Sequence, residues 1–187
     1  MQATHVSYAQ IPYTRGGNVN LNDVFRFVTP KVWDAAIKTA DQLKQLGIRY
    51  ALAGGLAVGA HGYLRATSDV DFLVGEEAFE HHGLLVTFRA GVPIEVDGIR
   101  IDYLSPIALG PQLDEALSHP SISEGIAVVP IEALIYMKLR ARRRRDLLDV
   151  VELVKAGADV TPVRSYLVAH APDLLTQFDE LVNEASG

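Results

Sequence analysis

Two aspartates stand two residues apart inside an otherwise apolar segment, residues 69–74 (DVDFLV). Side chains alternate along a strand, so Asp69 and Asp71 share one face while Val70 and Phe72 take the other. Ionised carboxylates on such a face are unfavourable unless a cation or hydrogen-bond donors compensate their charge. Aspartates also flank strands in many proteins without a metal, so the pair gains its meaning from the neighbouring sequence.

A glycine pair precedes this strand. Residues 48–53 are apolar apart from Arg49, as in a strand buried on both faces, and Gly54-Gly55 then begins a short helix that ends near His61. Backbone N–H groups at a glycine-rich helix start form an anion site. A turn that needs glycine for its geometry alone is the alternative for an isolated pair. The order strand, Gly-Gly, helix, Asp-x-Asp favours the anion site.

A hairpin follows the aspartate strand. Asp97-Gly98 lies between residues 92–96 and 99–104, and this dipeptide accepts the positive φ of a two-residue turn. Asp102 on the second strand is the third carboxylate candidate, on the same face as Arg100. Glu95 and Asp97 are rival candidates, although the turn already explains Asp97.

The chain divides into an irregular N-terminal arm (1–28), an α/β core (29–130) and a helical lobe (131–187). Thr29-Pro30 predicts the start of a helix that Gly47 ends, and Thr161-Pro162 predicts another helix start. The sequence also predicts a final core strand at 126–129, helices at 131–140 and 146–156, and a helical remainder to Asn183. No element is assigned to 76–89, and His81 and His82 are expected in a loop.

Positive charge is concentrated in the first part of the lobe. Lys138 follows an apolar helical stripe, so its stem faces inward, where its ammonium group either contacts a phosphate or escapes to water. An arginine run follows it and is either a solvated face or a site for a polyanion. Within it, i,i+4 spacing predicts pairs of Arg142 with Asp146 and of Arg145 with Asp149.

Composition excludes several classes of protein. There is no cysteine and no histidine pair at ligand spacing, which argues against disulfides and zinc. The 17 Lys and Arg against 23 Asp and Glu give a net charge of −6, unlike a protein that binds duplex DNA. No apolar run approaches the ~20 residues needed to span a bilayer, and the N-terminus has no apolar signal core. We therefore expect a cytoplasmic protein that has no membrane partner.

Three segments carry a resemblance to a known group of enzymes. Residues 51–74 (ALAGGLAVGAHGYLRATSDVDFLV) resemble the signature of the DNA polymerase β-type nucleotidyltransferase superfamily, a G-G or G-S turn, a short helix and R-x-T-x-D-x-D. Residues 130–153 (PIEALIYMKLRARRRRDLLDVVEL) and 99–104 (IRIDYL) are similar to the helical segment and third-carboxylate strand of the minimal bacterial branch related to AbiEii-like toxins. The implied fold is a short mixed sheet flanked by helices, of α/β or broadly α+β class, with a C-terminal helical lobe.

The resemblance implies a role for each matching residue. Catalysis and metal binding fall to three carboxylates, and the implied metal is Mg²⁺, with Mn²⁺ as a substitute. These carboxylates are Asp69, Asp71 and Asp102. Substrate binding falls to a second set, in which the two glycines contact the β and γ phosphates. This set is Gly54, Gly55, Arg65, Thr67, Lys138 and Asp149. An ion pair with a carboxylate is an equal alternative for Arg65, and Asp146 is structural by default.

The implied reaction is transfer of an NMP from a nucleoside triphosphate to an acceptor hydroxyl. The acceptor is an RNA 3′ end, such as that of a tRNA, a protein side chain or a small molecule, and the sequence does not choose among them. A toxin role with an antitoxin protein as partner is associated with the resembled relatives. The alternative is a non-catalytic module of the same fold that binds a nucleotide or a partner, as a regulatory or antitoxin-like subunit. Retention of all three carboxylates favours the enzyme.

Overall fold

The computed structural model describes residues 19–80 and 94–187. These residues form one six-stranded mixed sheet with the order β3-β4-β2-β1-β6-β5. β2 (Asp69–Val74) lies between β1 (Tyr50–Leu52), to which it is antiparallel, and β4 (Ile99–Leu104), to which it is parallel. The aspartate strand is therefore central, and the mixed α/β class expected from the sequence is confirmed.

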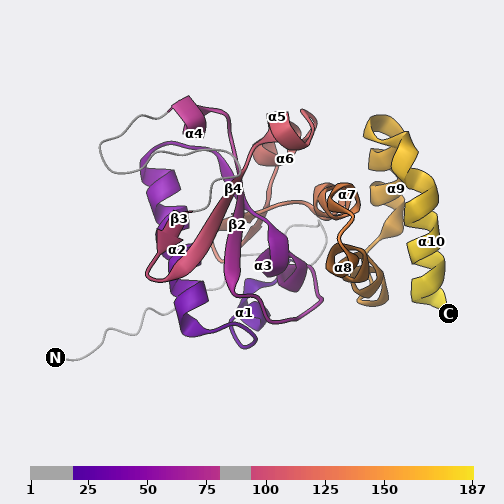
Figure 1. Ribbon diagram of the computed structural model, residues 1–187, viewed down its shortest axis with the longest axis horizontal. Helices are drawn as coiled ribbons and strands as arrows, with labels where there is room; N and C mark the ends of the chain where they lie inside the picture. The colour runs from indigo at the N-terminus through magenta and orange to yellow at the C-terminus, as the bar shows by residue number, and fades with distance from the viewer. Residues whose placement is uncertain (1–18, 81–93) are drawn as a thin grey trace.

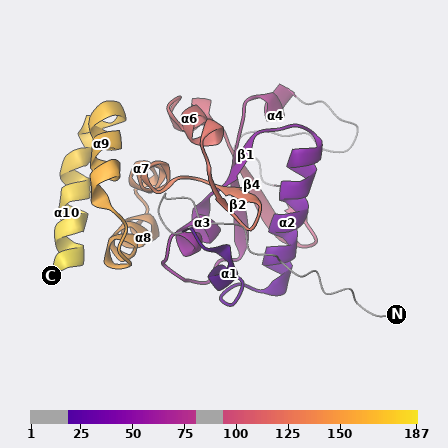
Figure 2. The ribbon, with the colours of Figure 1, turned by 180° about the vertical axis from the view of Figure 1, so that it is seen from behind.

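The two faces of the sheet differ as the alternation in β2 predicts. Val70 and Phe72 are fully buried, while Asp69 and Asp71 are only half-buried. Figures 1 and 2 place α2 (Pro30–Gln45) on one side of the sheet and α3 (Gly54–Ala60) on the other. Burial of one large apolar side chain contributes about 1.5–3 kcal/mol, so the apolar face holds the sheet while the other face stays available for polar groups.

Two hairpins complete the sheet. β3 (Ile94–Val96) turns into β4 through Asp97 and Gly98, with φ of 51° and 81°, as predicted for an Asp-Gly turn. β5 (Ser121–Ser123) turns into β6 (Ile126–Val128) through Glu124 and Gly125, with φ of 52° and 75°. β5 was not predicted, because Glu-Gly is a weaker turn signal than Asp-Gly.

The beginning of the described chain belongs to the core. α1 (Leu21–Val24) is a short helix whose Leu21 and Val24 are buried, so this part of the expected irregular arm is ordered. Its N-cap Asn20 accepts a hydrogen bond from the backbone of Asn22, which satisfies one free helix N–H group. Residues 1–18 lie outside the described residues.

Short helices connect the strands at one end of the sheet. α4 (Glu77–Glu80) follows β2 and falls in the segment to which the sequence assigned no element. His81, His82 and the rest of 81–93 lie outside the described residues. After β4 come α5 (Pro106–Leu109) and α6 (Leu113–Ser118), which the sequence analysis did not predict because they are too short to show a helical period.

Four α-helices and one 3₁₀ turn form the C-terminal lobe of the described chain. They are α7 (Ile131–Ala141), α8 (Arg144–Lys155), α9 (Val160–His170), η1 (Pro172–Leu174) and α10 (Leu175–Ser186). Figure 1 shows α7 and α8 between the sheet domain and the outer α9 and α10. The predicted Thr161 cap is wrong, because Asp159 is the N-cap and accepts from Thr161 N at 2.9 Å.

No helix within the described ranges is both long and apolar enough to cross a membrane.

Candidate functional site

The strand register brings the three predicted carboxylates onto one face of the sheet. Asp71 on β2 lies beside Asp102 on β4, and Asp69 lies beside Arg100. Adjacent strands are about 4.8 Å apart, and residues i and i+2 on one strand are about 7 Å apart. The face therefore holds a compact quartet of three acidic side chains and one basic side chain.

Asp71 is a carboxyl group whose pKa is strongly perturbed by this face. Burial raises the pKa of Asp71 to about 6, and the negative charges of Asp69 and Asp102 act in the same direction. The positive charges of Lys138 and Arg143 oppose the increase in this pKa without cancelling it. The protein fold thus leaves negative charge on this face only partly compensated.

Glycine is required at positions 54 and 55 because the side chains of Asp71 and Thr67 lie too close to the backbone there for a Cβ atom. Gly54 has a φ of +57°, and a Cβ placed there would overlap the Asp71 carboxylate. A Cβ at Gly55 would lie 2.7 Å from Thr67 Oγ1 and 2.8 Å from Thr67 Cβ. Turn geometry and close approach therefore both select glycine, and the backbone at the start of α3 lies directly against the carboxylate face.

The loop before β2 contributes two polar side chains with different partners. Thr67 Oγ1 donates to Asp69 Oδ1 at 2.7 Å, which fixes the orientation of that carboxylate. Arg65 donates from Nε and Nη2 to the two Asp149 oxygens, at 2.6 and 2.8 Å. Of the alternatives that the sequence leaves open for Arg65, the structure has the ion pair, with a partner on α8.

Lys138 and Asp149 belong to a buried ion-pair network in the helical lobe. The Lys138 ammonium lies 2.8 Å from both Asp146 Oδ1 and Asp149 Oδ2, and its side chain is 8% exposed. The two aspartates are 4% and 1% exposed. Lys138 is thus inward-facing as predicted, but its contacts are carboxylates, and Asp149 faces Arg65 and Lys138 instead of open space.

The expected pairing within the arginine run is corrected. Arg142 has a φ of 53° and ends α7, so it does not share a helix with Asp146. Asp146 instead accepts from Arg143 Nε at 2.6 Å, and Asp149 pairs with Arg65. Burial alone would raise the pKa of Asp146, but hydrogen bonds from Arg143 and Lys138 hold this pKa below its ordinary value.

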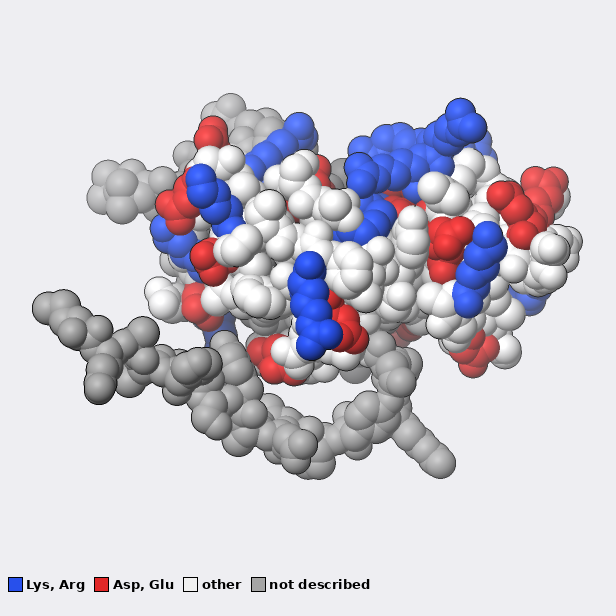
Figure 3. All heavy atoms as spheres, turned by 90° about the horizontal axis from the view of Figure 1, so that it is seen from below, with Lys and Arg blue, Asp and Glu red and all other residues white. Residues whose placement is uncertain are grey.

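The network leaves an excess of positive charge beside the aspartate face. Three cations, Arg65, Lys138 and Arg143, meet two carboxylates, so one positive charge is unbalanced. Figure 3 shows Lys and Arg side chains gathered over the α7–α8 part of the molecule. The exposed arginines of the run are Arg140, Arg142, Arg143, Arg144 and Arg145. Sequence reasoning did not single out Arg143, because four identical neighbours give no signal of which one faces the site.

Asp102 has a partner that sequence reasoning did not use. Arg100 donates from Nε and Nη2 to the two Asp102 oxygens, at 2.9 and 3.0 Å. Of the rival carboxylates, Glu95 is an exposed register partner of Arg100 on β3, one strand further from Asp69 and Asp71, and Asp97 pairs with Lys38 at 3.0 Å in the turn. The signal was present, because Arg100 and Asp102 are two residues apart on one strand and share a face.

His61 has a structural role at the end of α3. Its Nε2 donates to the carbonyl of Val129 at 2.7 Å, just after β6. Burial lowers the pKa of His61, although the hydrogen bond to Val129 acts in the opposite direction. This hydrogen bond ties the end of α3 to the segment that follows β6.

No group of three or more His, Cys, Asp or Glu side chains within residues 19–80 and 94–187 is arranged to hold a metal ion by itself. Asp102 is turned toward Arg100, and Asp69 is hydrogen-bonded to Thr67. Mg²⁺ is, however, often held by one or two carboxylates together with substrate phosphates. Asp69 and Asp71 supply hard oxygen donors of that kind on a face with uncompensated negative charge.

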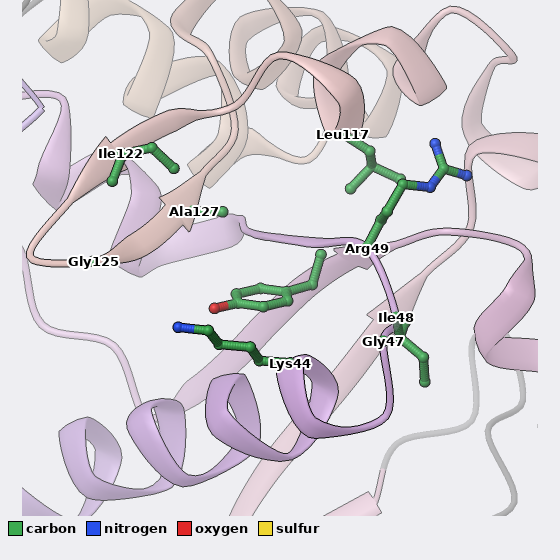
Figure 4. A pocket seen from close by; sticks show the side chains of 9 residues that line it. Lys44, Gly47, Ile48, Arg49, Leu117, Ile122, Gly125 and Ala127 are labelled. Carbon is green, nitrogen blue, oxygen red and sulfur yellow. The ribbon is translucent and has the colours of Figure 1, made fainter.

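A shallow hollow lies at the other end of β2. It has a volume of about 330 Å³ and is bordered by the end of α2, the start of β1 and the β5–β6 hairpin. Figure 4 shows Lys44 and Arg49 at this hollow, with Ile122 and Ala127 across from them. None of the predicted site residues borders it, so the carboxylate face remains the candidate site.

No protein-family model and no curated protein matches the chain. Among solved structures, it is similar to an antigenic nucleotidyltransferase-like protein from Paracoccidioides brasiliensis, with 13% sequence identity and a TM-score of 0.45. The superposition covers 82% of this chain and 94% of that protein. A likeness this distant does not assign an activity, and the AbiEii-like branch and toxin role stay predictions from the sequence.

The raised pKa of Asp71 predicts that removing its charge stabilises the protein. The folded-state pKa of about 6 lies above the unfolded value of 3.8, so stability from this group falls as pH rises through that interval. Asp71→Asn should therefore raise the free energy of unfolding by about 1–3 kcal/mol near pH 8. Near pH 4 the wild-type carboxyl is protonated and the gain should vanish. Urea unfolding at both pH values measures this, and a gain that is the same at both would contradict it.

The buried ion pairs predict a large loss of stability when Asp149 loses its charge. Asp149→Asn leaves Arg65 and Lys138 buried with one fewer carboxylate, which should cost about 3–5 kcal/mol. The matched control is Asp173→Asn, which breaks the exposed Arg140–Asp173 pair and should cost less than about 1 kcal/mol. The denaturant midpoints of the two variants measure these losses of stability. Similar losses in both would show that the buried Asp149 network stabilises the fold no more than an exposed ion pair does.

Proposed function

We propose that the chain is a Mg²⁺-dependent nucleotidyltransferase that moves an NMP from a nucleoside triphosphate to an acceptor hydroxyl. The observation that supports it most is the carboxylate face, where Asp71 and Asp102 are register partners and Asp69 lies on the same side. The glycine backbone of α3 borders that face, and basic side chains of the lobe lie near it.

Asp69 and Asp71 would hold the metal ion, with Asp102 as the third ligand once it separates from Arg100. When bound, Mg²⁺ would neutralise the charge that develops on the phosphate oxygens. The raised pKa of Asp71, about 6, supports this assignment because a nearby cation would relieve the repulsion from Asp69 and Asp102.

The remaining residues would bind and orient the triphosphate. Gly54 and Gly55 leave their backbone free of side chains where the phosphates would approach. Arg143 is 78% exposed and its position is fixed by the buried Asp146, so its guanidinium is available to a phosphate oxygen. Arg65, Lys138 and Asp149 hold one another, and we assign them to positioning Arg143 and the loop of Thr67 instead of direct substrate contact.

The chemical step is an in-line displacement at the α-phosphorus. The acceptor oxygen forms a bond to that phosphorus, the bond to the bridging oxygen breaks, and pyrophosphate leaves. The hydroxyl proton passes to a carboxylate of the site, for which Asp102 is our candidate. The same chemistry serves an RNA 3′ end, a protein side chain or a small molecule.

Label transfer tests this function. The protein is incubated with each α-labelled nucleoside triphosphate, Mg²⁺, and cellular RNA, protein or small-molecule fractions in separate arms. We expect transfer in one arm, reduced by about two orders of magnitude or more in Asp69→Asn/Asp71→Asn. Asp97→Asn is the matched control, because Asn tolerates the positive φ of the hairpin turn and the position lies outside the site.

Three outcomes discriminate between the functions. Equal transfer by the double variant would reject the site, and loss of transfer in Asp97→Asn as well would indicate a general effect on folding. Mg²⁺-dependent nucleotide binding without transfer in any arm would favour the non-catalytic binding module.

A further inference from the structure

Arg100 occupies both oxygens of the carboxylate that the proposed metal site needs. Its Nε lies 2.9 Å from Asp102 Oδ2, and its Nη2 lies 3.0 Å from Asp102 Oδ1. The contact is therefore a two-point ion pair between a planar guanidinium and a carboxylate, the geometry in which this pair is strongest. It explains why the three aspartates share a face but do not converge on one point.

Arg100 is the positively charged residue that the sheet itself places among the carboxylates of this face. Its register partners are Asp69 on β2 and Glu95 on β3, and Asp102 lies two residues along its own strand. An arginine among three acidic neighbours reduces their mutual repulsion when no metal ion is bound. A divalent ion on the same face would supply that compensation instead.

The two partners differ in exposure. The Arg100 side chain is 62% exposed, while that of Asp102 is 14% exposed. An arginine that packs against little can move into solvent without leaving a cavity, and exposed ion pairs contribute little net free energy. Both residues lie on β4, but the Asp102 side chain is largely buried and that of Arg100 is mostly in solvent, so Arg100 is the partner that can leave.

We propose that Arg100 competes with the divalent ion for Asp102, so that the third carboxylate joins the metal site only when the ion displaces Arg100. This inference rests on the proposed function, since it assumes a divalent ion on the carboxylate face. Arg100 acts through Asp102 and is thus a positioning residue that sets the ion affinity of the site.

The test measures binding of Mn²⁺ alone, by the loss of the free-ion electron paramagnetic resonance signal, in the full chain. Arg100→Gln frees Asp102, and this variant should bind Mn²⁺ about two- to fivefold more tightly than wild type, the range expected for release of an exposed ion pair. The matched control is Arg164→Gln, the same substitution in the exposed Arg164–Asp179 ion pair of the helical lobe, away from the carboxylate face. Its affinity should equal that of wild type.

A double-mutant cycle separates competition for Asp102 from a general charge effect. In an Asp102→Asn background, Arg100→Gln should give no gain, because the negatively charged carboxylate for which the two cations compete is gone. A gain that persists in this background, or equal Mn²⁺ affinity of Arg100→Gln and wild type, overturns the inference while leaving the proposed function intact. Absence of Mn²⁺ binding in every variant overturns the metal site and the inference together.

Discussion

The buried contact between Arg65 and Asp149 joins the two parts of the molecule. Arg65 lies in the loop that leads into β2, and Asp149 lies on α8, 84 residues later in the chain. Lys138 on α7 binds the same carboxylate, so one aspartate fixes the loop and both helices of the lobe that face the sheet. The backbone carbonyl of Ala66 accepts a further hydrogen bond from Arg145, which secures the same loop. Removal of such a central carboxylate leaves uncompensated buried cations.

This arrangement separates positive charge from negative charge across a short distance. The lobe carries an excess of cations, held by Asp146 and Asp149, and the sheet carries the three aspartates with Arg100. Lys138 and Arg143 lower the pKa of Asp71, yet burial and the other two carboxylates keep it at about 6. The folded chain thus keeps a face whose charge is unfavourable in isolation, which is typical of sites that bind a charged ligand.

The sequence predicted the features that depend on local patterns. Alternation in β2 and the Asp-Gly turn predicted the faces and the hairpin correctly, because strand geometry and positive φ are properties of a few adjacent residues. The sequence did not predict the partners of Arg65 and Asp146, because these partners depend on how the helical lobe packs against the sheet domain and on the turn at Arg142. The expected Arg142–Asp146 pair fails because α7 ends at Ala141 and Arg142 lies in the turn. Arg145 does share α8 with Asp149, but it donates to the backbone carbonyl of Ala66. The roles of the site residues stay predictions.

Glycine at position 54 shows how the fold and the candidate site depend on each other. Its positive φ turns the chain from β1 into α3, and the absence of a side chain lets the Asp71 carboxylate lie against that turn. Any side chain there would overlap the Asp71 side chain, so either the turn or that carboxylate would have to move. The same residue that starts the helix therefore sets the distance between its backbone N–H groups and the carboxylate face. A site for a metal-bound triphosphate would depend on this distance as much as on the carboxylates, because the phosphates and the metal ion must be held side by side.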